Sequence, residues 1–219
     1  MLKLRYVILA VTLFCCSSIY AQRTMKEFWT SMPDSLIEYL DATKRREMID
    51  FYGMGVRAEV FNVLEGKSVM DTLTTRFAAV TLSESSKLSV ALFPKNDGDT
   101  LICMVSTFLG PQPESTVSFY NTSWQMVPSS ALLPVLPASS FFLRPDTMSE
   151  DEYEKLVSLV DPVMTSATLH PDDDTIVFSL STPLLSKTDR ERLEAILVQR
   201  KYKWNGESFG NSAIKRKRM

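Results

Sequence analysis

The sequence predicts an α+β fold built on an antiparallel β-meander with flanking helices. Between residues 56 and 126, short apolar runs rich in β-branched and aromatic residues are separated by turn-forming clusters of Asn, Asp, Gly, Pro and Ser. Before and after this region, apolar residues instead recur at helical spacing. The chain is therefore expected to form either one such body or two related α+β units in tandem.

The segment before the meander is predicted to be helical. A first helix over 25–32 has its apolar residues on one face and ends before Pro33. A second helical stretch is expected over 35–52, with the charged run 44–47 as a solvated turn or face. Five strands are then expected, at Ala58–Leu64, Phe77–Leu82, Leu88–Phe93, Thr100–Phe108 and Thr116–Tyr120.

A second set of elements follows Pro137. Ser149 to Glu152 form a capping box that opens a helix ending before Pro162. Another helix, capped by Ser186 or Thr188, is expected to run through Leu197, and residues 213–219 are expected to be a frayed basic tail. The strands expected here are Thr165–Leu169, Thr175–Leu180, and a hairpin of Arg200–Trp204 and Glu207–Phe209 that turns at Asn205-Gly206.

Residues 1–21 have the three parts of a secretory signal peptide. Lys3 and Arg5 precede a short apolar run, and the segment ends in the small residue Ala21, after which cleavage is expected. The apolar run is shorter than the roughly 20 residues that span a bilayer. The alternative is a lipidated N-terminus at Cys15 or Cys16. We therefore expect a periplasmic, cell-envelope or extracellular protein, with no transmembrane segment in the mature chain.

Composition restricts the mature chain further. Cleavage after Ala21 removes two basic residues and leaves 22 basic and 26 acidic ones, a balance that does not favour nucleic acid. The remaining residues are divided into an N-terminal α+β unit at 22–126, a C-terminal α+β unit at 127–209 and a basic tail at 210–219. Cys103 is the one cysteine left, so no internal disulfide is possible, and its apolar surroundings predict a buried side chain.

Two windows of the sequence are similar to each other. Residues 99–109 align with residues 174–184, and each window follows an acidic turn and precedes a segment containing Tyr and Trp. A duplication of one α+β unit and a chance similarity between short strands both explain this.

No arrangement of residues typical of an active site is found. The sequence contains one histidine, no Gly-x-Ser-x-Gly elbow and no phosphate-binding glycine loop. Acidic turns at 97–99 and 172–174 are rich in possible calcium ligands but lack the spacing of a calcium loop. We therefore predict no catalytic, cofactor-binding or metal-binding residues. A pair of dispersed carboxylates for glycoside hydrolysis leaves no spacing signal, so an envelope hydrolase stays the alternative.

Several short motifs of turns, strands and aromatic residues occur together in this chain: Leu64-Glu65-Gly66, Leu73-Thr74, Leu92-Phe93-Pro94, Ile102-Cys103, Gly110-Pro111, Ser115, Phe119-Tyr120 and Trp124. On these residues the chain resembles a family of exported proteins of unknown function from gut Bacteroidales. The resemblance covers most of the mature chain and implies a location and an architecture, but no activity.

The function that these observations favour is non-catalytic binding. The expected partner is an envelope protein or a small apolar or glycan ligand. Trp29, Trp124 and Trp204 are candidates for an aromatic ligand groove, although their positions in apolar patterns also suit a core.

Overall fold

The computed structural model describes residues 23–181 and 185–216, with side chains described as far as residue 210. The described residues form the predicted α+β fold with an antiparallel meander. The α-helices are α2 (Met25–Ser31), α3 (Ala42–Gly53), α4 (Glu150–Ser158) and α5 (Lys187–Glu194). Three short 3₁₀ helices are η1 (Asp34–Leu36), η2 (Ser129–Ala131) and η3 (Ala138–Phe141).

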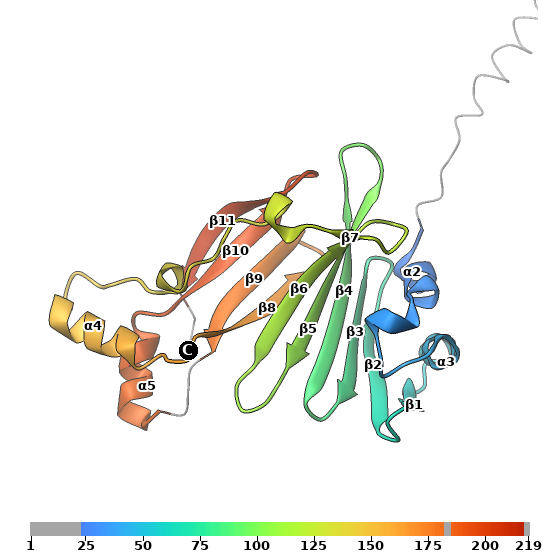
Figure 1. Cartoon of the computed structure of the whole chain (residues 1–219), viewed down its shortest axis with the longest axis horizontal. Helices are drawn as coiled ribbons and strands as arrows, with labels where there is room; N and C mark the ends of the chain where they lie inside the picture. Colours follow the sequence, from blue (N-terminus) through green and yellow to red (C-terminus); the bar gives the residue numbers. More distant parts are fainter. Residues whose placement is uncertain (1–22, 182–184, 217–219) are drawn as a thin grey trace, which may run out of the picture.

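The strands form two antiparallel sheets (Figure 1). The first sheet has seven strands in the order of the sequence: β1 (Glu59–Phe61), β2 (Lys67–Leu73), β3 (Phe77–Ser83), β4 (Ser86–Pro94), β5 (Thr100–Phe108), β6 (Glu114–Tyr120) and β7 (Met126–Val127). The second sheet has the order β11-β10-β9-β8, with strands β8 (Met164–His170), β9 (Thr175–Ser181), β10 (Val198–Trp204) and β11 (Phe209–Arg216).

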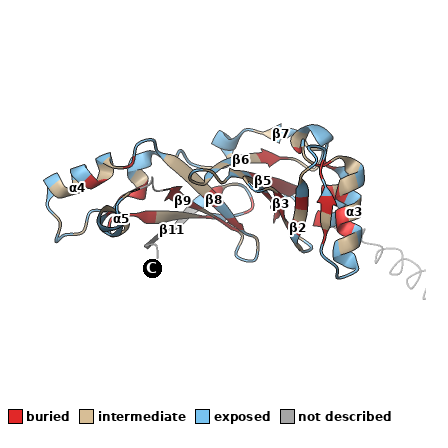
Figure 2. Cartoon of the chain, turned by 90° about the horizontal axis from the view of Figure 1, so that it is seen from below, coloured by how far each residue is buried: buried red, intermediate tan, exposed pale blue. Residues whose placement is uncertain are grey.

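The elements follow one another along the long axis of the molecule. From right to left in Figure 1 these are α2 and α3, the seven-stranded sheet, the four-stranded sheet, and α4 with α5. The view from below in Figure 2 shows the elements in the same order, with buried residues inside both sheets. Strand β8 lies against β6, β5 and β4, so the second sheet packs on part of the first.

Two hydrophobic cores result, one on each face of the first sheet. Strand β5 contributes to both, because successive residues of a strand point to opposite faces. Ile102 and Met104 join the core under α2 and α3, whereas Leu101, Cys103 and Val105 join the core shared with the second sheet. A strand buried on both faces explains the continuous apolar run in this part of the sequence.

The two sheets are joined at one end by their hairpin turns. The indole Nε1 of Trp204 donates to the carbonyl of Pro94 over 2.6 Å, and the amide of Asn96 donates to the carbonyl of Gly206 over 3.1 Å. Gly206 has φ +98°, and a Cβ there would lie 2.0 Å from Asn96 Oδ1. The glycine of the predicted Asn-Gly turn is thus required both by the turn and by contact with the other sheet.

Polar contacts also join the sheets along their length. The Ala167 amide on β8 donates to Ser115 Oγ on β6 over 3.0 Å. Arg76 forms an ion pair with Asp174 and donates to the Pro171 carbonyl over 3.0 Å. The second core and these contacts make the C-terminal strands depend on the first sheet for burial.

Arg45 is a buried cation that holds the N-terminal segment in place. Its side chain is 1% exposed and lies within 2.8 Å of the Asp34 carboxylate. Its guanidinium donates to the carbonyls of Trp29 (3.2 Å), Leu40 (2.6 Å) and Met32. One side chain therefore satisfies carbonyls from α2 and from the segments on both sides of η1, which no hydrophobic residue can do.

This arrangement corrects the predicted second helix over 35–52. Residues 37–41 are not helical, and α3 begins after Asp41, whose carboxylate caps the helix by accepting from the Lys44 amide over 2.8 Å. The run 44–47, predicted as a solvated turn or face, lies within α3 and contains the buried Arg45. The charged run 44–47 by itself predicts a solvated turn or face, because the sequence does not show the carbonyls that Arg45 binds.

Other boundaries also differ from those predicted. Strand β2 was not predicted, and its polar residues and a bulge between Met70 and Thr72 interrupt the alternation that would have revealed it. The tail predicted from Ala213 is wrong as far as Arg216, because β11 continues to that residue and pairs with β10. The proposed unit boundary at 126/127 falls inside β7, and the division into two units stays a prediction. The predicted signal peptide and the lipidation alternative lie outside the described residues.

We predict that replacing Arg45 with methionine destabilises the protein by about 3 kcal/mol or more, because three buried carbonyls lose their donor. Replacing Asp34 with asparagine should cost about 1 kcal/mol or less, since this carboxylate is largely exposed. Urea unfolding of both variants tests this. Equal losses for the two would contradict the role given to the buried carbonyls.

Candidate functional site

Cys103 lies in the core and not at a reactive site. Its side chain is fully buried, and burial raises the pKa of its thiol far above the ordinary value. A nucleophilic cysteine needs the thiolate and access to substrate, and Cys103 has neither. The predicted burial of this residue is confirmed.

Two of the three tryptophans also belong to the cores. Trp29 and Trp204 are buried, and Trp204 packs against Phe93 and Phe209 with ring centroids 6.1 and 5.0 Å away. Trp124 is half-buried. These rings therefore serve packing, and the structure gives them no shared ligand groove.

The acidic turns are engaged by neighbouring groups of the chain. Asp97 accepts from Lys95 Nζ over 2.6 Å and from the Asp99 amide over 3.0 Å, and these bonds lower the pKa of its carboxyl. Asp173 accepts from Lys201 Nζ over 3.2 Å, and Asp174 pairs with Arg76. Within residues 23–181 and 185–216, no three His, Cys, Asp or Glu side chains converge to hold a metal ion.

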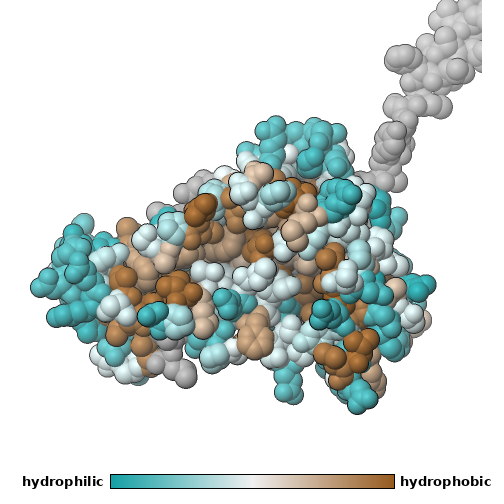
Figure 3. All heavy atoms as spheres, viewed as in Figure 1, coloured by the Kyte–Doolittle hydropathy of each residue, from teal (hydrophilic) through white to brown (hydrophobic). Residues whose placement is uncertain are grey.

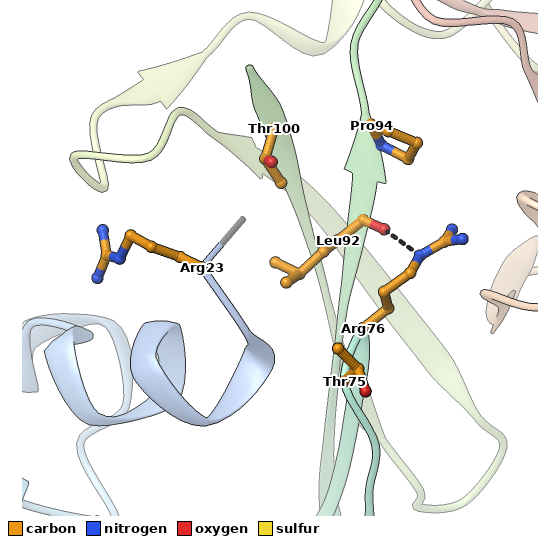
Figure 4. A pocket seen from close by; sticks show the side chains of 6 residues that line it. All are labelled: Arg23, Thr75, Arg76, Leu92, Pro94 and Thr100. Carbon is orange, nitrogen blue, oxygen red and sulfur yellow. Dashed lines mark hydrogen bonds between the residues drawn. The ribbon is translucent and has the colours of Figure 1, made fainter. Parts of the chain in front are cut away.

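A cavity of about 160 Å³ lies beside the start of α2 (Figure 4). Arg23 and Arg76 line it, but Figure 4 shows both guanidinium groups pointing away from its centre. Arg23 donates to Ser31 Oγ over 2.9 Å, and Arg76 donates through Nε to the Leu92 carbonyl over 3.3 Å. Because both arginines already have partners, the side chains left to contact a ligand in this cavity are mainly those of Leu92 and the threonines. The cavity therefore suits a small uncharged group better than an anion.

The β1–β2 turn carries an exposed apolar tip, here defined as Phe61, Val63 and Leu64. It corresponds to the brown area at the lower right of Figure 3, at the β1–β2 end of the first sheet. Buried Asn62 fixes this turn, because its side-chain oxygen accepts from the Leu64 and Gly66 amides over 3.0 and 3.1 Å. The tip is thus an exposed apolar surface whose turn is held in place by Asn62.

A second surface, at the ends of β4, β5 and β6, combines one aromatic ring with hydroxyl groups. We call it the hydroxyl face and define it by five residues, which together with Thr107 line a shallow pocket of about 210 Å³: Ser86, Ser106, Phe108, Glu114 and Thr116.

The register of the three strands sets the geometry of the hydroxyl face. Ser86, Phe108 and Glu114 are paired across β4, β5 and β6, so their side chains form one row on the same side of the sheet. Ser106 and Thr116 form the next row, two residues further along the strands. Phe108 is 56% exposed and lies between Ser86 and Glu114.

The polar groups of the hydroxyl face are available to a ligand. None of its hydroxyls, and neither oxygen of Glu114, bonds or pairs with another side chain or backbone group in the described part of the chain. On the reverse side of the same strands, by contrast, Thr107 and Ser115 bond each other over 2.8 Å. The hydroxyl face therefore presents an apolar ring beside unused donors and acceptors, the composition of a small polar-ligand site.

The hydroxyl face was not among the predicted sites, although its residues follow a pattern that is visible in the sequence. The buried run of β5 ends at Val105, and Ser106 and Phe108 then occupy alternate positions on one side of the strand. Glu114 and Thr116 alternate in the same way on β6. Pairing these two strands in register would have placed the four residues together.

These features define a two-sheet α+β protein with an exposed apolar tip and an exposed face of hydroxyl groups. Among the described helices, none is long and apolar enough to cross a bilayer. The chain belongs to the family described as "Protein of unknown function (DUF3256)", which it matches over residues 16–209. The predicted membership in a family of unknown function is therefore confirmed.

A solved structure has a similar fold. It is described as the structure of a domain of an uncharacterized protein from Porphyromonas gingivalis W83, a member of the Bacteroidales. The two chains share 18% sequence identity with a TM-score of 0.72, covering 88% of this chain and all of the other. At this identity the similarity shows the fold alone. No curated protein matches the chain.

We predict that the Cys103 thiol does not react with a water-soluble thiol reagent in the folded protein and reacts fully in denaturant, because the raised pKa and burial both suppress the thiolate. Labelling followed by peptide mass spectrometry measures the extent of modification separately for the peptide that contains Cys103. Rapid labelling of Cys103 under native conditions would contradict its place in the core.

Proposed function

We propose that this protein is an exported, non-catalytic binding protein of the periplasm or cell envelope, and that the hydroxyl face is its binding site. Export is supported by the N-terminal sequence, in which Lys3 and Arg5 precede a short apolar run that ends near Ala21. The observation that carries the binding role is the exposed Phe108 ring surrounded by polar groups without partners.

Binding is favoured over catalysis by the contents of the pocket. Glycoside hydrolysis, the alternative raised by the sequence, uses a pair of carboxylates on opposite sides of the scissile bond. Glu114 is the one carboxylate among the residues that line the hydroxyl face. A single carboxylate can orient a ligand, whereas it cannot supply both the acid and the base or nucleophile.

The site is also built on rigid elements. Ser86, Ser106 and Thr116 lie on three hydrogen-bonded strands whose inner parts are buried on both sides. Because these strands are already ordered, a ligand that binds there loses little of its contact energy to ordering the protein. The apolar tip supports a second interaction, with a protein partner, because it is exposed and held by Asn62.

We predict that the protein recovered from an exporting cell begins at Gln22. Intact-mass measurement on material from the periplasm or medium tests this directly. A chain that retains residues 1–21, or that is found only in the cytosol, would contradict the proposed export. A mass that corresponds to an acylated Cys15 or Cys16 would establish the lipidated alternative.

We predict that an environment-sensitive dye on Thr116→Cys changes its emission when the exported protein meets fractionated envelope material, since this position is exposed within the proposed site. Buried Cys103 leaves the introduced thiol as the reactive one. A matched probe at Lys67→Cys, near the apolar tip, serves as the control. No response, or a response at the control position alone, would overturn the assignment to the hydroxyl face, and the second result would favour a partner at the tip.

A further inference from the structure

The ligand class of the hydroxyl face follows from its chemistry. Resting on the binding role proposed above, we infer that this face binds the ring of a neutral sugar, with the ring stacked on Phe108 and its hydroxyls bonded to Glu114 and to the serine and threonine hydroxyls. A sugar ring has C–H groups on its faces and hydroxyls around its rim. It therefore needs an apolar platform surrounded by donors and acceptors.

The arrangement of residues fits both requirements. Phe108 lies in the middle of its row, with Ser86 on one side and Glu114 on the other. Paired residues on neighbouring strands lie about 5 Å apart, so groups on both sides of the ring are within reach of one ligand. Ser106 and Thr116 lie about 7 Å further along the strands and can meet a second edge of the same ligand.

Charge selects against acidic ligands. Glu114 has no basic partner within the described residues, and the pocket is lined by no Lys or Arg. The nearest lysine along β4, Lys87, alternates to the other side of the sheet from Ser86. An unpaired carboxylate accepts strong bonds from neutral hydroxyls and repels a second anion. This excludes phosphate and uronic acids as preferred ligands.

The shape of the site also bears on its affinity. The pocket is shallow, and one ring with a few hydrogen bonds supports a dissociation constant on the order of millimolar for a monosaccharide. Longer chains can bind more tightly only where further sugar units find contacts or where several sites act together.

The inference is tested by titrating the exported protein with glucose, galactose and N-acetylglucosamine, followed by amide NMR shifts. At least one of these sugars should bind at millimolar concentration, with shifts at Phe108, Glu114 and Thr116. Phe108→Ala should weaken binding about tenfold or abolish it, whereas the matched change Phe61→Ala, at a similarly exposed phenylalanine on the tip, should leave it unchanged.

Glucuronate tests the part played by charge. It should bind more weakly than glucose to the parent protein, and Glu114→Gln should reduce this difference while also weakening glucose binding. Glu65→Gln, an exposed glutamate of the β1–β2 turn, provides the control. Unfolding curves for each variant confirm that the fold is intact.

The possible outcomes separate this inference from the proposed function. If none of the neutral sugars shifts the named amides, the sugar assignment is wrong. It is also wrong if choline, titrated in the same way as a cationic probe, shifts these amides and the sugars do not. A dye response to an envelope fraction together with no sugar binding would preserve the binding role and remove the sugar. Failure of both assays would remove both.

Discussion

The burial of β5 on both faces is the constraint on which the rest of the structure depends. One face of this strand needs the cover of α2 and α3, and the other needs the second sheet. Polar contacts hold each of these covering layers in place. Arg45 donates hydrogen bonds to backbone carbonyls of the N-terminal segment, and Trp204 and Arg76 form hydrogen bonds that join the two sheets. Cys103 is the one cysteine in the described residues, so this part of the chain relies on apolar burial for stability and on a few buried polar bonds for the geometry of its layers.

The same constraint explains where a binding surface is available. The cover by α2 and α3 over one face of β5 ends before the strand does, since Met104 is buried and Ser106, the next residue on the same face, is exposed. Beyond this point the side chains of β4, β5 and β6 keep their register but meet solvent. The core therefore fixes the positions of groups that it does not cover. This gives the hydroxyl face the rigidity of a sheet interior together with the access of a surface.

Much of the meander could be predicted from sequence because its signals are local. Asn96-Asp97-Gly98 and Asn205-Gly206 mark two hairpins by backbone preference alone, and the alternation within β3 agrees with its burial. Burial of Arg45 and the course of β2 depend instead on groups distant in the sequence, such as the carbonyls of Trp29 and Met32. Phe108 shows the same limit: in the sequence it resembles any core phenylalanine, and only the extent of the helices and of the second sheet leaves it exposed.

The structure shows which elements the similar windows 99–109 and 174–184 belong to, and both explanations of their similarity agree with it. Both windows contain an inner strand, β5 in one sheet and β9 in the other, and each strand follows an acidic turn. Their surroundings differ, because β5 is covered on both faces, whereas β9 alternates between buried Ile176, Phe178 and Leu180 and partly exposed Val177 and Ser179. Similar inner strands need similar apolar patterns, so the likeness follows from packing as readily as from duplication. A shared origin would have to be visible in residues that packing does not dictate, and among the described residues Ser181, which aligns with the exposed Ser106 of the hydroxyl face, is buried.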